Sequence, residues 1–175
     1  MLIDLSELLS HEDKVLNLSI DLEMEHFETR LFDYSVADKK PVQFQISGTG
    51  SKKVEILADI ELALMIPCDR CLEDVKTQIK IHTSREVDLS ETEEEKREAL
   101  EDVDYIDGTM FNAEKFVYGE ILMNIPMKVL CRKDCKGICN RCGTNLNYKD
   151  CGCDTTELDP QMAKALEVFN SFKED

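Results

Sequence analysis

Six of the chain's eight cysteines fall within one stretch, Cys131 to Cys153, whose sequence is CRKDCKGICNRCGTNLNYKDCGC. Thiolates spaced two and three residues apart can converge on one tetrahedral centre, the geometry that zinc prefers in closed structural sites. Within this stretch, Cys139-Asn140-Arg141-Cys142-Gly143 has the pattern of a zinc knuckle: its backbone amides point at sulfur and its glycine tolerates a positive φ. The spacing therefore predicts a Zn²⁺ site.

The set of ligands is not fixed by the spacing, because six cysteines exceed one four-ligand site and eight would fill two. The sequence favours a knuckle closed by a short return, which gives the set Cys139, Cys142, Cys151 and Cys153. Cys135 or Cys131 could replace either of the last two.

The remaining cysteines, Cys68 and Cys71, occupy the expected tip of a hairpin with the sequence PCDRCLED. Three interpretations stay open: a second metal site completed by two C-terminal cysteines, a pair of small buried thiols, and a redox dithiol. Two ligands alone do not hold zinc, so the metal interpretation requires the C-terminal module to fold back onto the hairpin. The redox interpretation is the least favoured, because no helix N-terminus follows Cys68 to lower its pKa.

Other cysteine chemistry fits the sequence less well. A disulfide framework would require an oxidising compartment, but the first residues, MLIDLSELLSHEDK, have no basic start, no long apolar run and no small-residue cleavage site. An iron–sulfur cluster would use the same thiolates and is the alternative cofactor. No apolar stretch approaches the length of a membrane span. We therefore expect a cytoplasmic zinc protein with no membrane contact.

The formal net charge of −16 disfavours binding to phosphate backbones without local compensation. Residues 86–107 carry eleven acids and two cations, a net of −9, whereas residues 126–153 carry six cations and two acids, a net of +4 before metal and thiolates are counted. The candidate RNA-binding residues are Arg132, Lys133, Lys136 and Arg141, with Arg70 from the hairpin tip. The alternative is that these cations only balance the zinc thiolates.

Alternation of apolar and polar residues predicts strands over 16–24, 42–47 and 53–66 and a fourth beginning at Val75. These strands imply an antiparallel sheet with one solvent-exposed face. Leucines at positions 2, 5, 8 and 9 predict a short helix over residues 1–10. Asn112 is expected to cap a helix that ends before Pro126, with an inner face formed by Phe116, Val117, Leu122 and Met123.

A last helix is expected after Asp159-Pro160, whereas the acidic run 90–102 shows no apolar periodicity. The elements together predict an α+β fold: an antiparallel sheet, with a barrel-like arrangement as the alternative, a few helices and a small C-terminal Cys-rich zinc module. The expected domains are 1–125, which includes the acidic segment 86–107, and 126–175 with the zinc module and the last helix.

Two motifs resemble the YceD family of large-subunit ribosomal RNA accumulation proteins. Cys68-Asp69-Arg70-Cys71 is similar to the family's C-x-R-C, and DCKGICNRCGTNLNYKDCGC through Asp159-Pro160 is similar to its C-terminal motif. The departures are Asn140 in place of the usual proline, Ile138 in place of leucine and Gln161 where arginine often follows. Some family members keep the C-x-R-C pair without the C-terminal cluster, which would make the zinc structural and place the shared function near Arg70.

The resemblance implies a ribosome-biogenesis factor that supports accumulation or processing of large-subunit ribosomal RNA and binds that RNA, its precursor or a ribosomal protein. No catalytic acid pair or phosphate-binding glycine loop is present, and the three histidines lie apart on separate predicted elements. We therefore expect no enzymatic activity and no small-molecule substrate. The alternative function is a thiol oxidoreductase that uses Cys68 and Cys71.

Overall fold

The longest elements are two paired strands, β6 (Lys53–Pro67) and β7 (Asp74–Asp88), in a computed structural model that describes residues 1–10, 14–50, 52–89, 104–153, 162 and 164. Their antiparallel register runs without a break from Lys53 opposite Asp88 to Pro67 opposite Asp74. Even-numbered side chains of β6 are buried along almost its whole length. This confirms the half-buried strand predicted for 53–66.

The other strands of this sheet lie on the side of β6 opposite β7. Strand β5 (Val42–Gly50) pairs with its first half and β4 (Asp33–Lys39) with its second half, while β2 (Val15–Ile20) pairs with β5 and β3 (His26–Glu28) with β4. Every pairing is antiparallel. Among the described residues β7 pairs with β6 alone, so the sheet is open and the barrel-like alternative is wrong.

A smaller sheet joins the first residues of the chain to residues 106–112. It has the order β1 (Leu2–Asp4), β9 (Met110–Asn112) and β8 (Ile106–Asp107), and helix α1 (Ser6–Ser10) follows β1. The prediction of one helix over 1–10 is therefore wrong for its first half. Pairing with β9, more than a hundred residues away, holds Leu2–Asp4 extended, and the Asp4 carboxylate accepts a hydrogen bond from the backbone N–H of Ser6 at the start of the helix.

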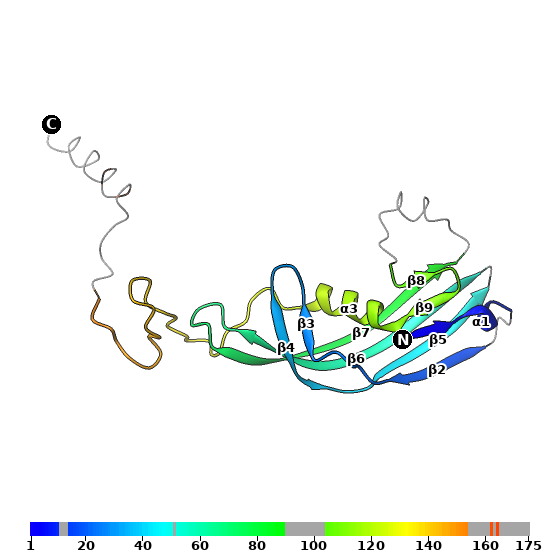
Figure 1. Ribbon diagram of the computed structural model, residues 1–175, viewed down its shortest axis with the longest axis horizontal. Helices are drawn as coiled ribbons and strands as arrows, with labels where there is room; N and C mark the ends of the chain where they lie inside the picture. The colour runs from blue at the N-terminus through cyan, green and yellow to red at the C-terminus, as the bar shows by residue number, and fades with distance from the viewer. Residues whose placement is uncertain (11–13, 51, 90–103, 154–161, 163, 165–175) are drawn as a thin grey trace. The chain divides into compact units, whose positions relative to one another are not determined.

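Helix α3 (Ala113–Asn124) lies along one face of the large sheet (Figure 1). The side chain of Asn112 accepts a hydrogen bond from the backbone N–H of Lys115, which confirms the predicted cap. The buried positions follow a helical stripe: Ala113, Phe116, Val117, Glu120 and Ile121. Leu122 and Met123 are 47% and 62% exposed, so the inner face predicted for these two residues is wrong.

An ion pair joins α3 to β7: Arg85 Nε donates to Glu120 Oε1 at 2.8 Å, with the Glu120 side chain 5% exposed and that of Arg85 44% exposed. Replacing Arg85 by alanine would leave a buried carboxylate unpaired, and we expect the free energy of unfolding to fall by about 3 kcal/mol. Glu120→Gln keeps an acceptor for Arg85 and should cost about 1 kcal/mol. Urea unfolding followed by circular dichroism measures both. Equal losses for the two variants would contradict this assignment.

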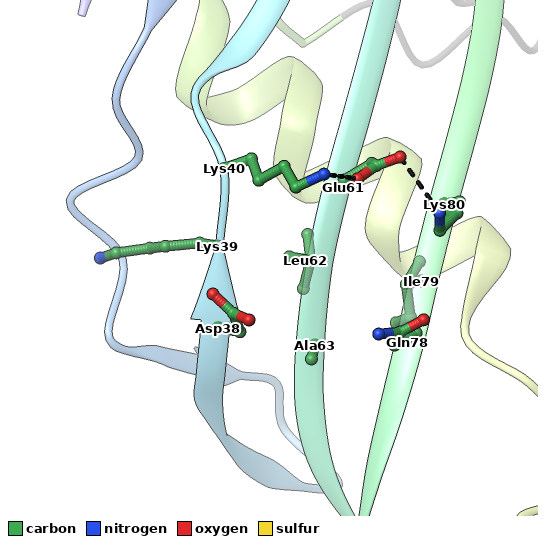
Figure 2. Close-up of a pocket in the computed structure, with 9 residues that line it drawn as sticks. All are labelled: Asp38, Lys39, Lys40, Glu61, Leu62, Ala63, Gln78, Ile79 and Lys80. Carbon is green, nitrogen blue, oxygen red and sulfur yellow. Dashed lines mark hydrogen bonds and ion pairs between the residues drawn. The ribbon is translucent and has the colours of Figure 1, made fainter.

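The opposite face of the sheet is polar, as the alternation predicts. Lys40, between β4 and β5, and Lys80 on β7 donate to the two carboxylate oxygens of Glu61, with α3 behind the sheet (Figure 2). The hydrogen bond from Lys40, followed by that from Lys80, lowers the pKa of Glu61. His82 and Asp59 pair one row further along this face, at 2.6 Å. These charges compensate one another, so this face has no uniform sign.

The chain divides into two compact units, one comprising Met1–Pro67 and Asp74–Val129 and the other Cys68–Glu73 and Leu130–Asp175. The tip of the β6–β7 hairpin thus belongs to the cysteine-rich unit, which we call the metal-binding unit. The acidic run 90–102 and almost all of the predicted C-terminal helix lie outside the described residues. Within the described part of the chain, no helix is long and apolar enough to cross a membrane.

Candidate metal centres

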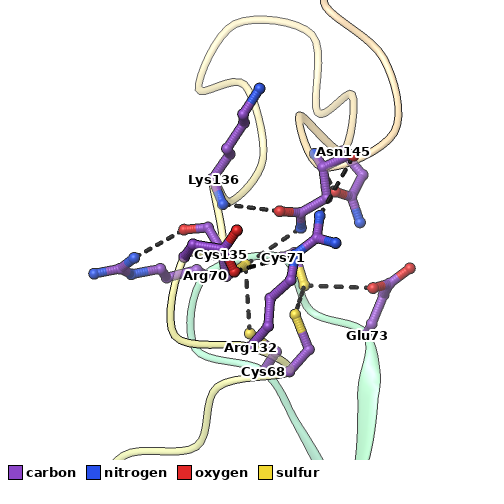
Figure 3. A network of polar contacts seen from close by, with 11 residues as sticks. Cys68, Arg70, Cys71, Glu73, Arg132, Cys135, Lys136 and Asn145 are labelled. Atoms are coloured by element: carbon purple, nitrogen blue, oxygen red, sulfur yellow. Dashed lines mark hydrogen bonds and ion pairs between the residues drawn. The ribbon is translucent and has the colours of Figure 1, made fainter.

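The first centre combines the hairpin tip with the start of the cysteine-rich stretch. Cys68, Cys71, Cys131 and Cys135 place their sulfurs within 4.8 Å of one another. The Sγ–Sγ distance is 3.9 Å for Cys68 and Cys135 (Figure 3), and it is 3.5 Å for Cys71 and Cys131. Four sulfurs bound to Zn²⁺ at about 2.3 Å in a tetrahedron are separated by about 3.8 Å. The spacing of these thiols therefore fits one tetrahedral ion.

The second centre is formed by Cys139, Cys142, Cys151 and Cys153, whose sulfurs also lie within 4.8 Å of one another. This is the set that the sequence favours. Cys131 and Cys135 instead lie with the hairpin pair, and all eight cysteines are thiols rather than disulfides. The cysteines thus form two complete four-thiol sets, either of which could hold a metal ion.

Both centres contain the same knuckle. In Cys68-Asp69-Arg70-Cys71-Leu72 the backbone N–H of Leu72 donates to the carbonyl of Cys68 at 2.9 Å, and in Cys139-Asn140-Arg141-Cys142-Gly143 the N–H of Gly143 donates to the carbonyl of Cys139 at 2.9 Å. The last residue of each has a positive φ, 62° at Leu72 and 71° at Gly143. The turn predicted for the C-terminal motif thus occurs twice in the chain.

The knuckle amides act on the first sulfur of each motif. Burial opposes ionisation of Cys68, but backbone N–H groups of Cys131, Arg70 and Cys71 outweigh it and lower the Cys68 pKa to about 6. The corresponding amides of Cys142 and Arg141 lower the pKa of Cys139. Each knuckle therefore stabilises a thiolate, the form that binds metal.

One thiol of each set, Cys131 in the first and Cys153 in the second, resists ionisation instead. Burial and then hydrogen bonding to Cys71 raise the pKa of Cys131 to about 12. Hydrogen bonds with Cys142 and Cys151 raise the pKa of Cys153 to about 12. Negative charge already present in the set disfavours further thiolates, and a bound divalent cation reverses this effect. Each set of four sulfurs therefore fits one bound divalent cation.

Arg70 connects the first knuckle to the loop that carries Cys135. Its Nη1 donates to the carbonyl of Cys135 at 2.8 Å, and its own carbonyl accepts from the N–H of Ile138 at 3.1 Å (Figure 3). Gly137 lies between them with a φ of 82°, and a Cβ added there would be 3.0 Å from the Arg70 carbonyl oxygen. The first centre thus depends on a close backbone approach at Gly137.

Asn147 links the centres, and no sequence signal distinguishes it from the neighbouring asparagines. It belongs to the loop between Cys142 and Cys151, yet its Nδ2 donates to Cys135 Sγ at 3.3 Å and its Oδ1 accepts from the backbone N–H of Lys136 at 2.8 Å. The hydrogen bond from Asn147 is the first cause that lowers the pKa of Cys135. Asn147 therefore stabilises a ligand of one centre from the loop of the other.

Replacing Asn147 by alanine should weaken metal binding at the first centre by about 10- to 100-fold, the usual effect of losing a partner of a ligand. Competition with a chromogenic chelator should show one weakened ion per chain and one of unchanged affinity. Asn140→Ala, in the second knuckle, is the matched control. Weakening of both ions to the same extent would contradict this role.

The five candidate RNA-binding cations are all exposed and all belong to the metal-binding unit. Like Arg70, Arg132 makes contacts within the metal-binding unit. Arg132 Nη2 donates to the Asn147 carbonyl at 3.4 Å, and Arg132 Nε lies 3.9 Å from Asp134 Oδ1. The Lys136 side chain points away from the sulfurs (Figure 3). Lys133 and Arg141 are exposed on the loops beside Cys131 and Cys142.

Comparison with known proteins connects these motifs to a family. The family model described as large ribosomal RNA subunit accumulation protein YceD matches residues 57–169, which include all eight cysteines. The chain is 25% identical over 149 residues to a protein of Arabidopsis thaliana named large ribosomal RNA subunit accumulation protein YCED homolog 1, chloroplastic, covering 70% of this chain and 46% of that protein.

Uncharacterized proteins of Mycobacterium tuberculosis and Mycobacterium bovis are 23% identical over 102 residues, covering 58% of this chain and 49% of theirs. The chain thus spans about half the length of the curated relatives it matches. No solved structure matches it. Because the family model covers well over half of the chain, the resemblance seen in the sequence is confirmed, and the chain belongs to the YceD family of large ribosomal RNA subunit accumulation proteins.

Proposed function

We propose that the protein is a non-catalytic ribosome-biogenesis factor that supports accumulation of large-subunit ribosomal RNA and holds two structural Zn²⁺ ions. The observation that carries the proposal is the pair of complete four-thiol sets in a chain of this family. Four protein ligands close a zinc site, whereas catalytic zinc keeps one position for water or substrate. The two knuckles favour zinc over an iron–sulfur cluster, the alternative for the same thiols.

The lowered pKa of Cys68 is a feature that the hairpin pair shares with redox dithiols, but burial of the pair disfavours the oxidoreductase alternative. Cys68 is fully buried and Cys71 is 5% exposed. A reactive dithiol needs a sulfur that a disulfide substrate can reach. Sharing of these thiols with Cys131 and Cys135 in one tetrahedral set favours a structural role.

The direct partner is large-subunit ribosomal RNA, its precursor or a ribosomal protein, and the charges favour the protein. Residues 68–73 and 130–153 of the metal-binding unit, which contain all eight cysteines, have six lysines and arginines against four acids, a net of +2. One Zn²⁺ with four thiolates carries −2, so two centres bring these residues to −2 and the whole chain from −16 to −20. The second centre thus removes the basic excess expected from the sequence, and a basic protein suits this surface better than a phosphate backbone.

Depletion of the protein in its own cells tests the function. The ratio of large-subunit to small-subunit ribosomal RNA should fall, and the wild-type chain should restore it. Cys142→Ser should fail to restore it if the metal-binding unit is required. An unchanged ratio after depletion would overturn the proposal, and rapid alkylation of Cys68 in the zinc-loaded protein at neutral pH would favour the oxidoreductase.

A further inference from the structure

Leu72 occupies a position that folding alone would give to glycine. The two knuckles have the same backbone, but the residue with positive φ is Gly143 in one and Leu72 in the other. A residue with a Cβ pays about 1–2 kcal/mol for this conformation. The Leu72 side chain is 64% exposed, so burial recovers little of that cost. Such an outlier points to a role outside the fold of the knuckle itself.

A second exposed apolar side chain lies close to Leu72. Tyr148 is 74% exposed and follows Asn147, whose carbonyl accepts a hydrogen bond from Arg132; the residue before Arg132, Cys131, has its Sγ 3.5 Å from that of Cys71, the residue before Leu72. The carboxylate of Glu73, the residue after Leu72, raises the pKa of Tyr148. Arg132 contacts the same loop through the carbonyl of Asn147. Tyrosine and arginine are among the residue types that dominate binding energy at protein interfaces.

The charge around these side chains identifies the class of partner. With both centres filled, residues 68–73 and 130–153 have a net charge of −2 and the chain −20, by the count given above. RNA binding depends on cations that neutralise phosphates, which this balance does not provide. A positively charged polypeptide is attracted instead.

We propose that Leu72 and Tyr148, with Arg132 beside them, form a docking surface for a basic protein of the large ribosomal subunit. We call it the Leu72–Tyr148 surface. The proposal rests on the proposed function and specifies the partner through which the chain acts. Leu72 supplies apolar contact area, Tyr148 supplies an aromatic ring, and the negative field of the unit attracts the basic partner.

Leu72→Gly in the full zinc-loaded chain separates recognition from folding. The probes are total protein extracted from isolated large ribosomal subunits and, separately, protein-free large-subunit ribosomal RNA. The wild-type chain should retain a basic subunit protein, identified by mass spectrometry, and Leu72→Gly should weaken its binding at least about tenfold, as expected for one exposed leucine buried on association. Zinc content should stay at two, and thermal stability should be equal or higher because the backbone strain is relieved.

Two further variants sharpen the result. Tyr148→Ala should weaken binding to a similar extent, whereas Tyr148→Phe, which keeps the ring, should weaken it less. Leu31 is 90% exposed in the other unit and gives the matched control: Leu31→Gly should leave binding of the subunit protein unchanged.

Several results would overturn the proposal. Loss of zinc or of stability in Leu72→Gly would show that the leucine serves the fold. RNA binding that falls with Leu72→Gly would assign the surface to RNA, and self-association lost in this variant would assign it to a second copy. Binding of a subunit protein that is insensitive to Leu72→Gly and Tyr148→Ala would refute this surface while leaving the proposed function intact, since that depends on the ribosomal RNA ratio after depletion.

Discussion

Replacement of Cys142 by serine is expected to lower the zinc content from two ions per chain to one and to unfold the loops of the second centre. Structural zinc in small modules contributes an apparent 10–16 kcal/mol, about the whole stability of such a unit. The strands of the first unit have their own apolar core and should keep it. Elemental analysis and hydrogen exchange resolved by residue should therefore show loss of one ion and of protection beyond about residue 135 only, since the Lys136 N–H also loses its bond to Asn147.

Cys71→Ser is the matching variant for the first centre. It should also leave one ion, but the lost protection should fall on Cys68–Glu73 and on the loop around Cys135. Strands β6 and β7 should stay protected up to the hairpin tip. A loss of both ions in either variant would mean that the centres fold only together, and iron in the purified protein would replace the zinc assignment.

Alanine at Gly137 is expected to disrupt the first centre without touching a ligand. Its φ of 82° strains any residue with a Cβ by about 1–2 kcal/mol. The added carbon would also lie 3.0 Å from the Arg70 carbonyl oxygen, so the hydrogen bond from Ile138 to Arg70 would be lost at a cost of about 1 kcal/mol. About 3 kcal/mol corresponds to about a hundredfold weaker metal binding. Chelator competition measures it.

Gly152→Ala is the control for backbone strain alone. Its φ is 67°, but nothing lies within 4 Å of an added Cβ. It should weaken only the second centre, by about tenfold, as expected for strain without a clash. Equal effects of Gly137→Ala and Gly152→Ala would show that the approach to Arg70 does not matter.

Local patterns predicted the elements whose sequence carries a complete signal. Alternation over 42–47 and 53–66 places β5 and β6, and the side chain of Asn112 with Pro126 brackets α3. The predicted inner face of α3 is confirmed at Phe116 and Val117 but wrong at Leu122 and Met123, because the helical spacing instead buries Glu120 and Ile121. Burial of Glu120 depends on Arg85, a partner from a distant strand.

The sequence patterns do not predict the strands that form only by pairing with another strand. β1 becomes a strand only through β9, and β3 is a three-residue strand held by β4. Tyr34 and Val36 in β4 do alternate with polar neighbours, but the run is short and highly charged. For the cysteines, spacing within 131–153 favoured the second set, whereas nothing local in the sequence assigns Cys131 and Cys135 to the hairpin pair.

The separation of the first centre's cysteines along the chain would set the order in which the two proposed centres could bind metal during synthesis. Cys71 and Cys131 are 60 residues apart, whereas Cys142 and Cys151 are nine apart, so closing the longer loop costs an unfolded chain about 2 kcal/mol more. At a rate of synthesis of about 5–20 residues per second, Cys131 is made at least about 3 s after Cys71. The second centre can close as soon as its own loop is made. In a growing cell that is short of zinc or exposed to oxidant, we therefore expect Cys68 and Cys71 to be oxidised before the cysteines of the C-terminal knuckle.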